Sequence, residues 1–148
     1  MFKHILIATD GSPLSRTAID KGIELAGMSR ASVVGIYVRP PMPLYLYSEG
    51  GSMIPPEVPA AYSARTKATA AGYLAEIATA AQKAKVAFEA IDVEDGSPAD
   101  AILRVAGEKR CDLIVMASHG RKGLSRVLLG SETSKVLTHA TQAVLVTR

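Results

Sequence analysis

Short apolar runs alternate with segments of helical character along the whole chain, and this alternation constrains the fold more than any other feature. The apolar runs, rich in Ile, Val and Leu, lie at residues 5–8, 33–38, 86–93, 113–116 and 143–146. Between them, small and apolar residues recur at helical spacing, as in the Ala-rich segment 60–84. Apolar strands separated by helices are typical of a parallel sheet covered on both faces. We therefore predict an α/β domain of order β-α-β-α-β-α-β-α-β.

Size and composition fit one domain with a sizeable core. Of the 148 residues, 48% are hydrophobic and 21% charged, so we treat 1–148 as a single domain. No apolar stretch approaches the length of about 18 residues that a membrane-spanning helix needs. The apolar run after Met1 is too short for a secretory signal, and the single cysteine, Cys111, indicates a reducing compartment. We expect a cytoplasmic protein in which Cys111 is a packed small residue rather than a redox sensor.

Charge is distributed unevenly along the chain. The formal net charge is +3, but residues 101–148 carry eight Lys and Arg against three Asp and Glu, while residues 1–100 sum to −2. A basic last third fits an anionic partner such as phosphate. The basic residues cluster in one loop rather than along a stripe, and only 5% of residues are aromatic. Both facts argue against nucleic-acid binding.

One segment interrupts the alternation. Residues 40–59 hold six of the eight prolines, together with a Gly-Gly pair. Prolines at this density are incompatible with a regular helix or a central strand. We predict a long surface loop, which either packs over its own domain or serves as a lid or partner-binding loop.

The tetrapeptide Asp-Gly-Ser-Pro occurs twice, at 10–13 and at 95–98, each time after a predicted strand and before a predicted helix. Serine is a favoured helix N-cap and proline a favoured first helical residue. Asp100 completes a pattern like a capping box with Ser97. The tetrapeptide by itself therefore indicates turn chemistry, and Asp10 needs further support before it counts as a site residue.

The most informative stretch is 117–131, which leaves the fourth predicted strand and ends at the start of a short predicted helix, 131–139. Its glycines allow backbone to approach a ligand closely: Gly120, Gly123 and Gly130. Ser131 is placed to cap the helix, and a helix N-terminus favours anions. Side chains that carry or can gain positive charge lie in the same loop: His119, Arg121, Lys122 and Arg126. We predict a phosphate site here, although the basic residues also fit a solvated surface loop.

These residues and their order resemble the universal stress protein family over nearly the whole chain. Nucleotide-binding members carry G-x2-G-x9-G-[S/T] after the fourth strand, and this chain has Ala117-x2-Gly120-x9-Gly130-Ser131. The opening at 5–12, the run at 112–116 and the closing run at 143–146 also match the family. The one departure is Ala117, which replaces the first glycine of the motif. Its methyl group would crowd a ribose or phosphate, or would require a backbone angle that alanine tolerates poorly.

The resemblance implies an open, Rossmann-like five-stranded parallel sheet of order 3-2-1-4-5, with helices on both faces. Ligands in such sheets bind at the carboxyl ends of the strands, where the order reverses. By analogy, Asp10 lies near the ribose, the backbone of Val38 meets the adenine, and three residues hold the phosphates: Gly120, Gly130 and Ser131. Second-rank contacts would come from Thr9, Met116, His119, Arg121, Glu132 and Thr133, beside the substituted motif position Ala117.

Three functions remain open at this stage. The first is a dimeric regulator of stress tolerance that binds ATP or AMP, with or without Mg²⁺, and pairs through the strand at 143–147. The second is a slow ATPase or autophosphorylating protein, although no convincing base is evident and His119 fits a phosphate or surface contact better than a general base. The third is a dimeric interaction protein without nucleotide. No catalytic residue is predicted. No resident metal site is predicted either, because one cysteine and three histidines cannot supply a structural zinc site.

Overall fold

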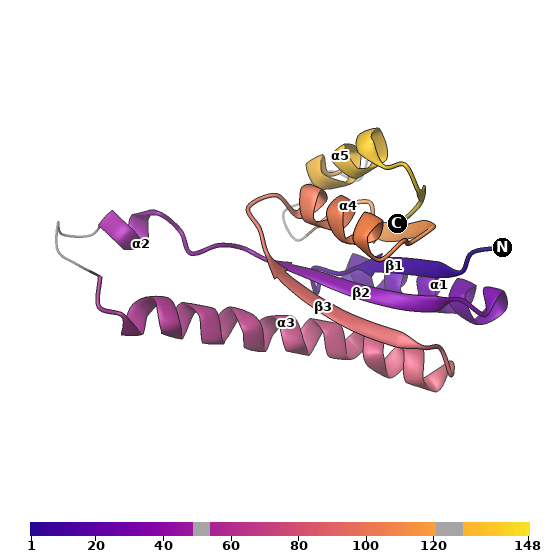
Figure 1. The fold of residues 1–148 in the computed structure, drawn as a ribbon, viewed down its shortest axis with the longest axis horizontal. Helices are drawn as coiled ribbons and strands as arrows, with labels where there is room; N and C mark the ends of the chain where they lie inside the picture. The colour runs from indigo at the N-terminus through magenta and orange to yellow at the C-terminus, as the bar shows by residue number, and fades with distance from the viewer. Residues whose placement is uncertain (49–53, 121–128) are drawn as a thin grey trace.

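The computed structural model describes residues 1–48, 54–120 and 129–148, in which strands and helices alternate as the sequence predicts (Figure 1). The strands are β1 (His4–Ala8), β2 (Ser32–Arg39), β3 (Phe88–Glu94), β4 (Leu113–Ala117) and β5 (Ala143–Thr147). The helices are α1 (Pro13–Ser29), α2 (Tyr45–Ser48), α3 (Glu57–Lys83), α4 (Pro98–Glu108) and α5 (Ser131–His139). None of the described helices is long and apolar enough to cross a membrane.

The five strands form one parallel sheet of order β3-β2-β1-β4-β5, which confirms the predicted topology. The chain starts in the middle of the sheet, builds outward through β2 and β3, then returns to build the other half through β4 and β5. The order therefore reverses between β1 and β4. This reversal brings the carboxyl ends of two sequence-distant strands together, with Ile7 opposite Val115 in the last paired position.

Both faces of the sheet are covered, as Figure 1 shows. On one face, α1 and α3 pack through a cluster that includes Ile5, Ile7 and Ile77. On the other, α4 and α5 pack through a cluster that includes Leu6, Ile114 and Val136. Because successive strand residues point to opposite faces, the central strands need apolar residues at every position. This is why their sequence runs are continuously apolar.

The proline-rich segment differs in part from the prediction of a loop over 40–59. A four-residue helix, α2, lies within it, and α3 begins at Glu57 rather than near residue 60. Pro59 is tolerated because the first-turn N–H groups of a helix have no intrahelical acceptor, so its missing N–H costs no hydrogen bond. The Tyr62 hydroxyl donates to Pro40 O (3.0 Å) and Pro41 O (3.1 Å), which ties the start of the segment to α3.

The third strand begins at Phe88, two residues later than predicted. Val86 N–H donates to Ala81 O (2.9 Å) and Lys85 N–H to Gln82 O (3.1 Å). Lys85 has a left-handed backbone, with φ of 56°. These bonds close the carboxyl end of α3, so the first apolar residue of the run completes the helix instead of entering the sheet.

Arg39, at the end of β2, is a buried cation held by two carboxylates of β3. Its side chain is 9% exposed, and its Nη1 lies 3.2 Å from Glu94 Oε2. Its Nε lies 3.3 Å from Asp92 Oδ2 but makes no hydrogen bond within the described residues, so this second contact is an ion pair only. The cluster joins the ends of β2 and β3 on the face covered by α3.

Arg39→Met is expected to lower the free energy of unfolding by about 2 kcal/mol. Breaking a fully buried ion pair costs about 3–5 kcal/mol, but Asp92 and Glu94 are 30% and 47% exposed and regain water. Urea denaturation followed by far-UV circular dichroism measures the change. The matched control is Arg16→Met, whose side chain is 63% exposed in its pair with Glu76 and which should change stability by less than about 0.5 kcal/mol. Equal effects of the two substitutions would contradict a special role for the buried arginine.

Candidate functional site

The carboxyl ends of β1 and β4 meet at one edge of the sheet, and Asp10 and Gly120 lie side by side there. A methyl group added at Gly120 would be 2.9 Å from Asp10 Oδ2. The glycine therefore leaves room directly beside the carboxylate. The two residues are far apart in sequence, and the β1–β4 pairing brings them together. This proximity is what the predicted common crevice requires, and the crevice itself stays a prediction.

Asp10 sits in a tight turn that fixes its carboxylate. Ser12 N–H donates to Asp10 Oδ1 (2.9 Å), and the Ser12 side chain accepts from Ser15 N–H (3.2 Å) to cap α1. The second copy of the tetrapeptide repeats the first of these bonds, since Ser97 N–H donates to Asp95 Oδ1 (2.9 Å), but Ser97 makes no cap bond within the described residues. The Asp-to-Ser bond is therefore turn chemistry that both copies share. What distinguishes Asp10 is its place at the point where the strand order reverses, beside Gly120.

The N-terminus of α5 lies on the end of β4. Gly130 is its N-cap, and Gly130 N–H donates to Ser118 O (2.8 Å). The Thr133 hydroxyl reaches Ala117 O (3.0 Å) and Ser118 O (3.2 Å). A methyl group at Gly130 would lie 3.2 Å from Ser118 O and 3.4 Å from the His119 Cα. The glycine therefore favours this close approach, because any side chain would push the two backbones apart. Ser118, which the sequence analysis did not single out, is the residue on which α5 is anchored.

The first-turn N–H groups of α5 have no intrahelical acceptor, which makes this end favourable for an anion. The first intrahelical bond runs from Ser134 N–H to Gly130 O (2.9 Å). Within the described residues, no side chain caps the helix. Ser131 is the first residue of the helix rather than its cap, so the prediction of a Ser131 cap is wrong. Gly130 takes that position because its backbone, with φ of −61° and ψ of 154°, is extended as an N-cap requires.

The carboxylate of Glu132 bonds to the start of the neighbouring helix. Its Oε2 accepts from Ala99 N–H (2.8 Å) at the start of α4, and its Oε1 lies 3.2 Å from Lys135 Nζ. The predicted capping box of α4 is not formed, because Ser97 makes no side-chain cap bond to the described part of the chain. A carboxylate from 33 residues away takes that role. No local pattern could have indicated it.

The other predicted contacts divide into core residues and backbone contributors. Thr9 is 7% exposed, and its hydroxyl bonds Ser15 Oγ (3.1 Å) and Gly11 N–H (3.1 Å). Met116 is 6% exposed within the core beneath α4 and α5. Thr9 N–H donates to Ile36 O (3.0 Å), so by the alternation of a parallel ladder the backbone groups of Val38 also face the β1 side. They lie beyond Ala8, the last paired residue of β1, and so point past the carboxyl end of that strand.

Ala117 fits its position without strain. It ends β4, is 8% exposed, and does not belong to the described residues with positive φ. The backbone angle that would penalise alanine is therefore not required here. Of the two costs expected for this substitution, only crowding of a ligand remains.

His119 presents a buried nitrogen next to Gly120. Its Nδ1 lies 3.0 Å from Ser118 Oγ, whereas its Nε2 is buried and has no hydrogen-bond partner among the described residues. A buried nitrogen without a partner is costly, so Nε2 is suited to a ligand group. Arg121, together with Lys122 and Arg126, lies outside the described residues.

Cys111 is 4% exposed and lies two residues before β4 begins. Burial, followed by the nearby charge of Asp112, raises the pKa of its thiol to about 11. The thiol therefore stays protonated near neutral pH, which agrees with a packed residue rather than a redox sensor.

Comparison with known proteins gives a consistent result. The sequence profile of the Universal stress protein family matches residues 1–148. Universal stress protein MJ0531 of Methanocaldococcus jannaschii is 33% identical over 149 residues, which cover 100% of this chain and 83% of that protein. Universal stress protein YxiE of Bacillus subtilis is 33% identical over 162 residues, with 100% of both chains covered.

Solved structures share the fold. The structure of MJ0577 superposes with a TM-score of 0.84 at 24% identity and covers 99% of this chain and 96% of that one. A universal stress protein crystallised in complex with cAMP superposes with a TM-score of 0.73 at 25% identity, covering 99% and 97% of the two chains.

Proposed function

Since the chain belongs to the universal stress protein family, we propose that it binds an adenine nucleotide in the crevice between β1 and β4, as a dimeric regulator of the stress response. The observation that carries the proposal is the approach of three elements at that crevice. Asp10 faces Gly120, and Gly130 holds the uncapped N-terminus of α5 against Ser118 in the described part of the chain. A carboxylate beside a glycine and an anion-favouring helix end suits a ligand with a ribose at one end and phosphates at the other.

The phosphates would lie at the α5 end. Backbone N–H groups of the first turn, starting at Ser131, would donate to phosphate oxygens, and Gly120 and Gly130 leave the backbone accessible. His119 Nε2 is a further donor on the same strand-to-helix connection when protonated at that nitrogen. Glu132, which would repel a phosphate, is held by Ala99 N–H and Lys135. These contacts support a phosphate site built largely from backbone.

The nucleoside would lie between β1 and β2. The carboxylate of Asp10 is suited to accept hydrogen bonds from ribose hydroxyls, and the backbone groups of Val38 are suited to an adenine edge. The cAMP complex of a related protein supports the adenine assignment. Asp10 would also supply a carboxylate to a Mg²⁺ that is bound mainly by the phosphates, which is a common arrangement for that ion.

Binding, rather than hydrolysis, fits the described chemistry. His119 Nδ1 meets a serine hydroxyl rather than a carboxylate, so nothing in the described site orients it as a general base. We also propose a cytoplasmic location, because the single cysteine, Cys111, is free and fits a reducing compartment.

MgATP at about 100 times its dissociation constant is expected to raise the melting temperature by about 5–10 °C. Binding at that concentration raises the free energy of unfolding by about 2.7 kcal/mol. Each kcal/mol raises the melting temperature of a chain of this size by about 2–4 °C. Differential scanning fluorimetry with ATP, AMP and adenosine ranks the contributions of phosphate and nucleoside. GTP serves as the control for adenine recognition. The absence of any shift with millimolar ATP would overturn the proposal and would indicate that the Ala117 methyl group closes the site.

Dimerisation is proposed through β5. This strand is an edge of the sheet, is continuously apolar from Ala143 to Val146, and carries no charge within its bounds. Such an edge is open to pairing with another strand. Sedimentation equilibrium should show a dimer at micromolar concentration, and Ala143→Lys, at an exposed residue of the strand, should shift it to monomer. A wild-type protein that sediments as a monomer would contradict this part of the proposal.

A further inference from the structure

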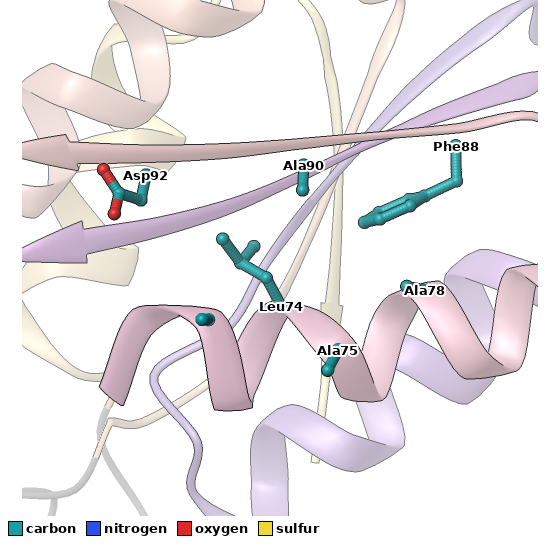
Figure 2. Close-up of a pocket in the computed structure, with 7 residues that line it drawn as sticks. Leu74, Ala75, Ala78, Phe88, Ala90 and Asp92 are labelled. Carbon is teal, nitrogen blue, oxygen red and sulfur yellow. The ribbon is translucent and has the colours of Figure 1, made fainter. Parts of the chain in front are cut away.

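An open groove of about 430 Å³ runs between α3 and the edge strand β3 (Figure 2). It lies at the edge of the sheet opposite to β5. Its lining is almost wholly apolar and small: Ala71, Leu74, Ala75, Ala78, Phe88, Ala90 and Asp92. Ala71, Ala75 and Ala90 are exposed. In Figure 2 the helix and the strand run alongside each other with Leu74 and Phe88 between them. The groove has the volume of a ligand or peptide site, and it is separate from the crevice between β1 and β4.

The backbone of β3 is available along this groove. Val33 N–H donates to Ala87 O (2.8 Å) and Asp95 N–H to Arg39 O (3.1 Å). In a parallel ladder, both backbone groups of a residue face the same neighbour, so the odd-numbered residues of β3 bond to β2. The even-numbered residues direct N–H and C=O away from the sheet. These are the residues whose side chains face α3: Phe88, Ala90, Asp92 and Glu94.

Charge identifies the kind of segment that fits. One end of the groove is apolar, with Phe88 and Ala90, whereas the other is lined by Asp92. Glu94 follows Asp92 in β3, just beyond the lining. Arg39 is the one cation paired with these two carboxylates within the described residues, which leaves an excess of one negative charge. β3 itself contains no Lys or Arg between 88 and 94. A strand with small apolar side chains at one end and basic side chains at the other complements this surface.

We propose that the groove binds an extended basic segment of a partner protein, which adds to β3 as an extra strand beneath α3. The edge N–H and C=O groups supply main-chain hydrogen bonds, and the groove admits alternate side chains, which is how strand addition between an edge strand and a helix achieves specificity. A second copy of β3 is a poorer occupant. Self-pairing would bring together the negative charge that Asp92 and Glu94 leave beyond Arg39 on each copy, and like charges on facing strands oppose such pairing.

The test uses the full chain and a synthetic peptide, acetyl-Val-Thr-Val-Thr-Lys-Thr-Lys-amide, with the reversed sequence to establish strand direction. The control peptide replaces both lysines by glutamate. Of the forward and reversed lysine peptides, the one that binds more tightly should also bind about tenfold more tightly than the same sequence with glutamates, as measured by fluorescence anisotropy of labelled peptide. Amide chemical-shift changes in the ¹⁵N-labelled protein should be concentrated at Phe88–Glu94 and along the Ala71–Ala78 face of α3.

Matched variants separate the groove from the rest of α3. Ala75→Arg, which fills the groove and adds a like charge, should weaken binding of the lysine peptide at least about tenfold. Thr69→Arg adds the same charge at an exposed residue that does not line the groove. At 3.6 residues per turn, Thr69 lies on a different face of the helix from Ala75, so this variant should keep the affinity within about twofold. Circular dichroism verifies that both variants are folded.

Equal affinities for the lysine and glutamate peptides, no binding at millimolar peptide, or shift changes centred elsewhere would each overturn the proposal. A wild-type self-association that Ala75→Arg abolishes and Thr69→Arg preserves would also overturn it, by assigning the groove to a second copy. MgATP is absent from these measurements, so their outcome is independent of nucleotide binding.

Discussion

Gly11→Ala is expected to lower the free energy of unfolding by about 3 kcal/mol. Gly11 has a left-handed backbone, with φ of 75°, which costs a residue with a Cβ about 1–2 kcal/mol. The added methyl group would also overlap the ring of Tyr73, and overpacking costs about 1–3 kcal/mol. Tyr73 is itself packed edge-on against Tyr37, with ring centroids 5.2 Å apart, so the ring moves away only by giving up that contact.

Gly96→Ala is the matched control, because Gly96 occupies the same position in the second Asp-Gly-Ser-Pro turn. It has no described atom within 4 Å of an added Cβ and no positive φ. Its substitution should leave stability unchanged or raise it by up to about 1 kcal/mol. Urea denaturation at one fixed protein concentration, followed by far-UV circular dichroism because the chain has no tryptophan, compares the two. Equal midpoints would show that Tyr73 does not confine Gly11.

Gly130→Val is expected to weaken MgATP binding about 100-fold. The valine side chain would meet backbone, Ser118 O at 3.2 Å and His119 Cα at 3.4 Å from its Cβ, so the start of α5 must move from the end of β4. Losing two hydrogen bonds between backbone N–H groups and phosphate, at about 1.5 kcal/mol each, corresponds to about this factor in affinity.

Isothermal titration calorimetry well below the melting temperature separates this loss from any change in stability. Gly27→Val is the control, because Gly27 lies in α1 and an added Cβ there meets no described atom within 4 Å. Its affinity should match that of the wild type. An unchanged affinity in Gly130→Val would place the phosphates away from α5.

Much of the fold follows from local patterns. Runs rich in apolar residues predicted all five strands, and the predicted bounds of α5 are those of the structure. Errors arose where neighbours in space took over a local role. The N-terminus of α4 is capped by Glu132 rather than by its own Ser97, and the residue that begins the third run, Val86, closes α3. A capping box or a strand start is a preference of a short segment by itself. In the folded chain, each backbone N–H group bonds to whichever acceptor the tertiary structure places near it.

The candidate site shows the same division. The glycine spacing indicated a phosphate loop, and the loop does reach a helix N-terminus at Gly130. The sequence did not indicate that the side chains of four further predicted contacts are engaged in hydrogen bonds or core packing: Thr9, Met116, Glu132 and Thr133. The groove beside β3 left no sequence signal at all, since its alanines resemble any helical alanines until the adjacent strand is in place.

The sequence by itself determined the fold class, the strand order through its family resemblance, and the candidate residues, because hydrophobic period, turn chemistry and motif spacing are properties of short segments. Tertiary structure alone decided that Asp10 faces Gly120 while Asp95, in an identical tetrapeptide, does not. It also decided that Gly11 is confined by Tyr73, whereas an added Cβ at Gly96 would meet open space in the described part of the chain. The physical reason is that both distinctions depend on strands and helices far apart in the chain, whose positions are set by packing on the sheet.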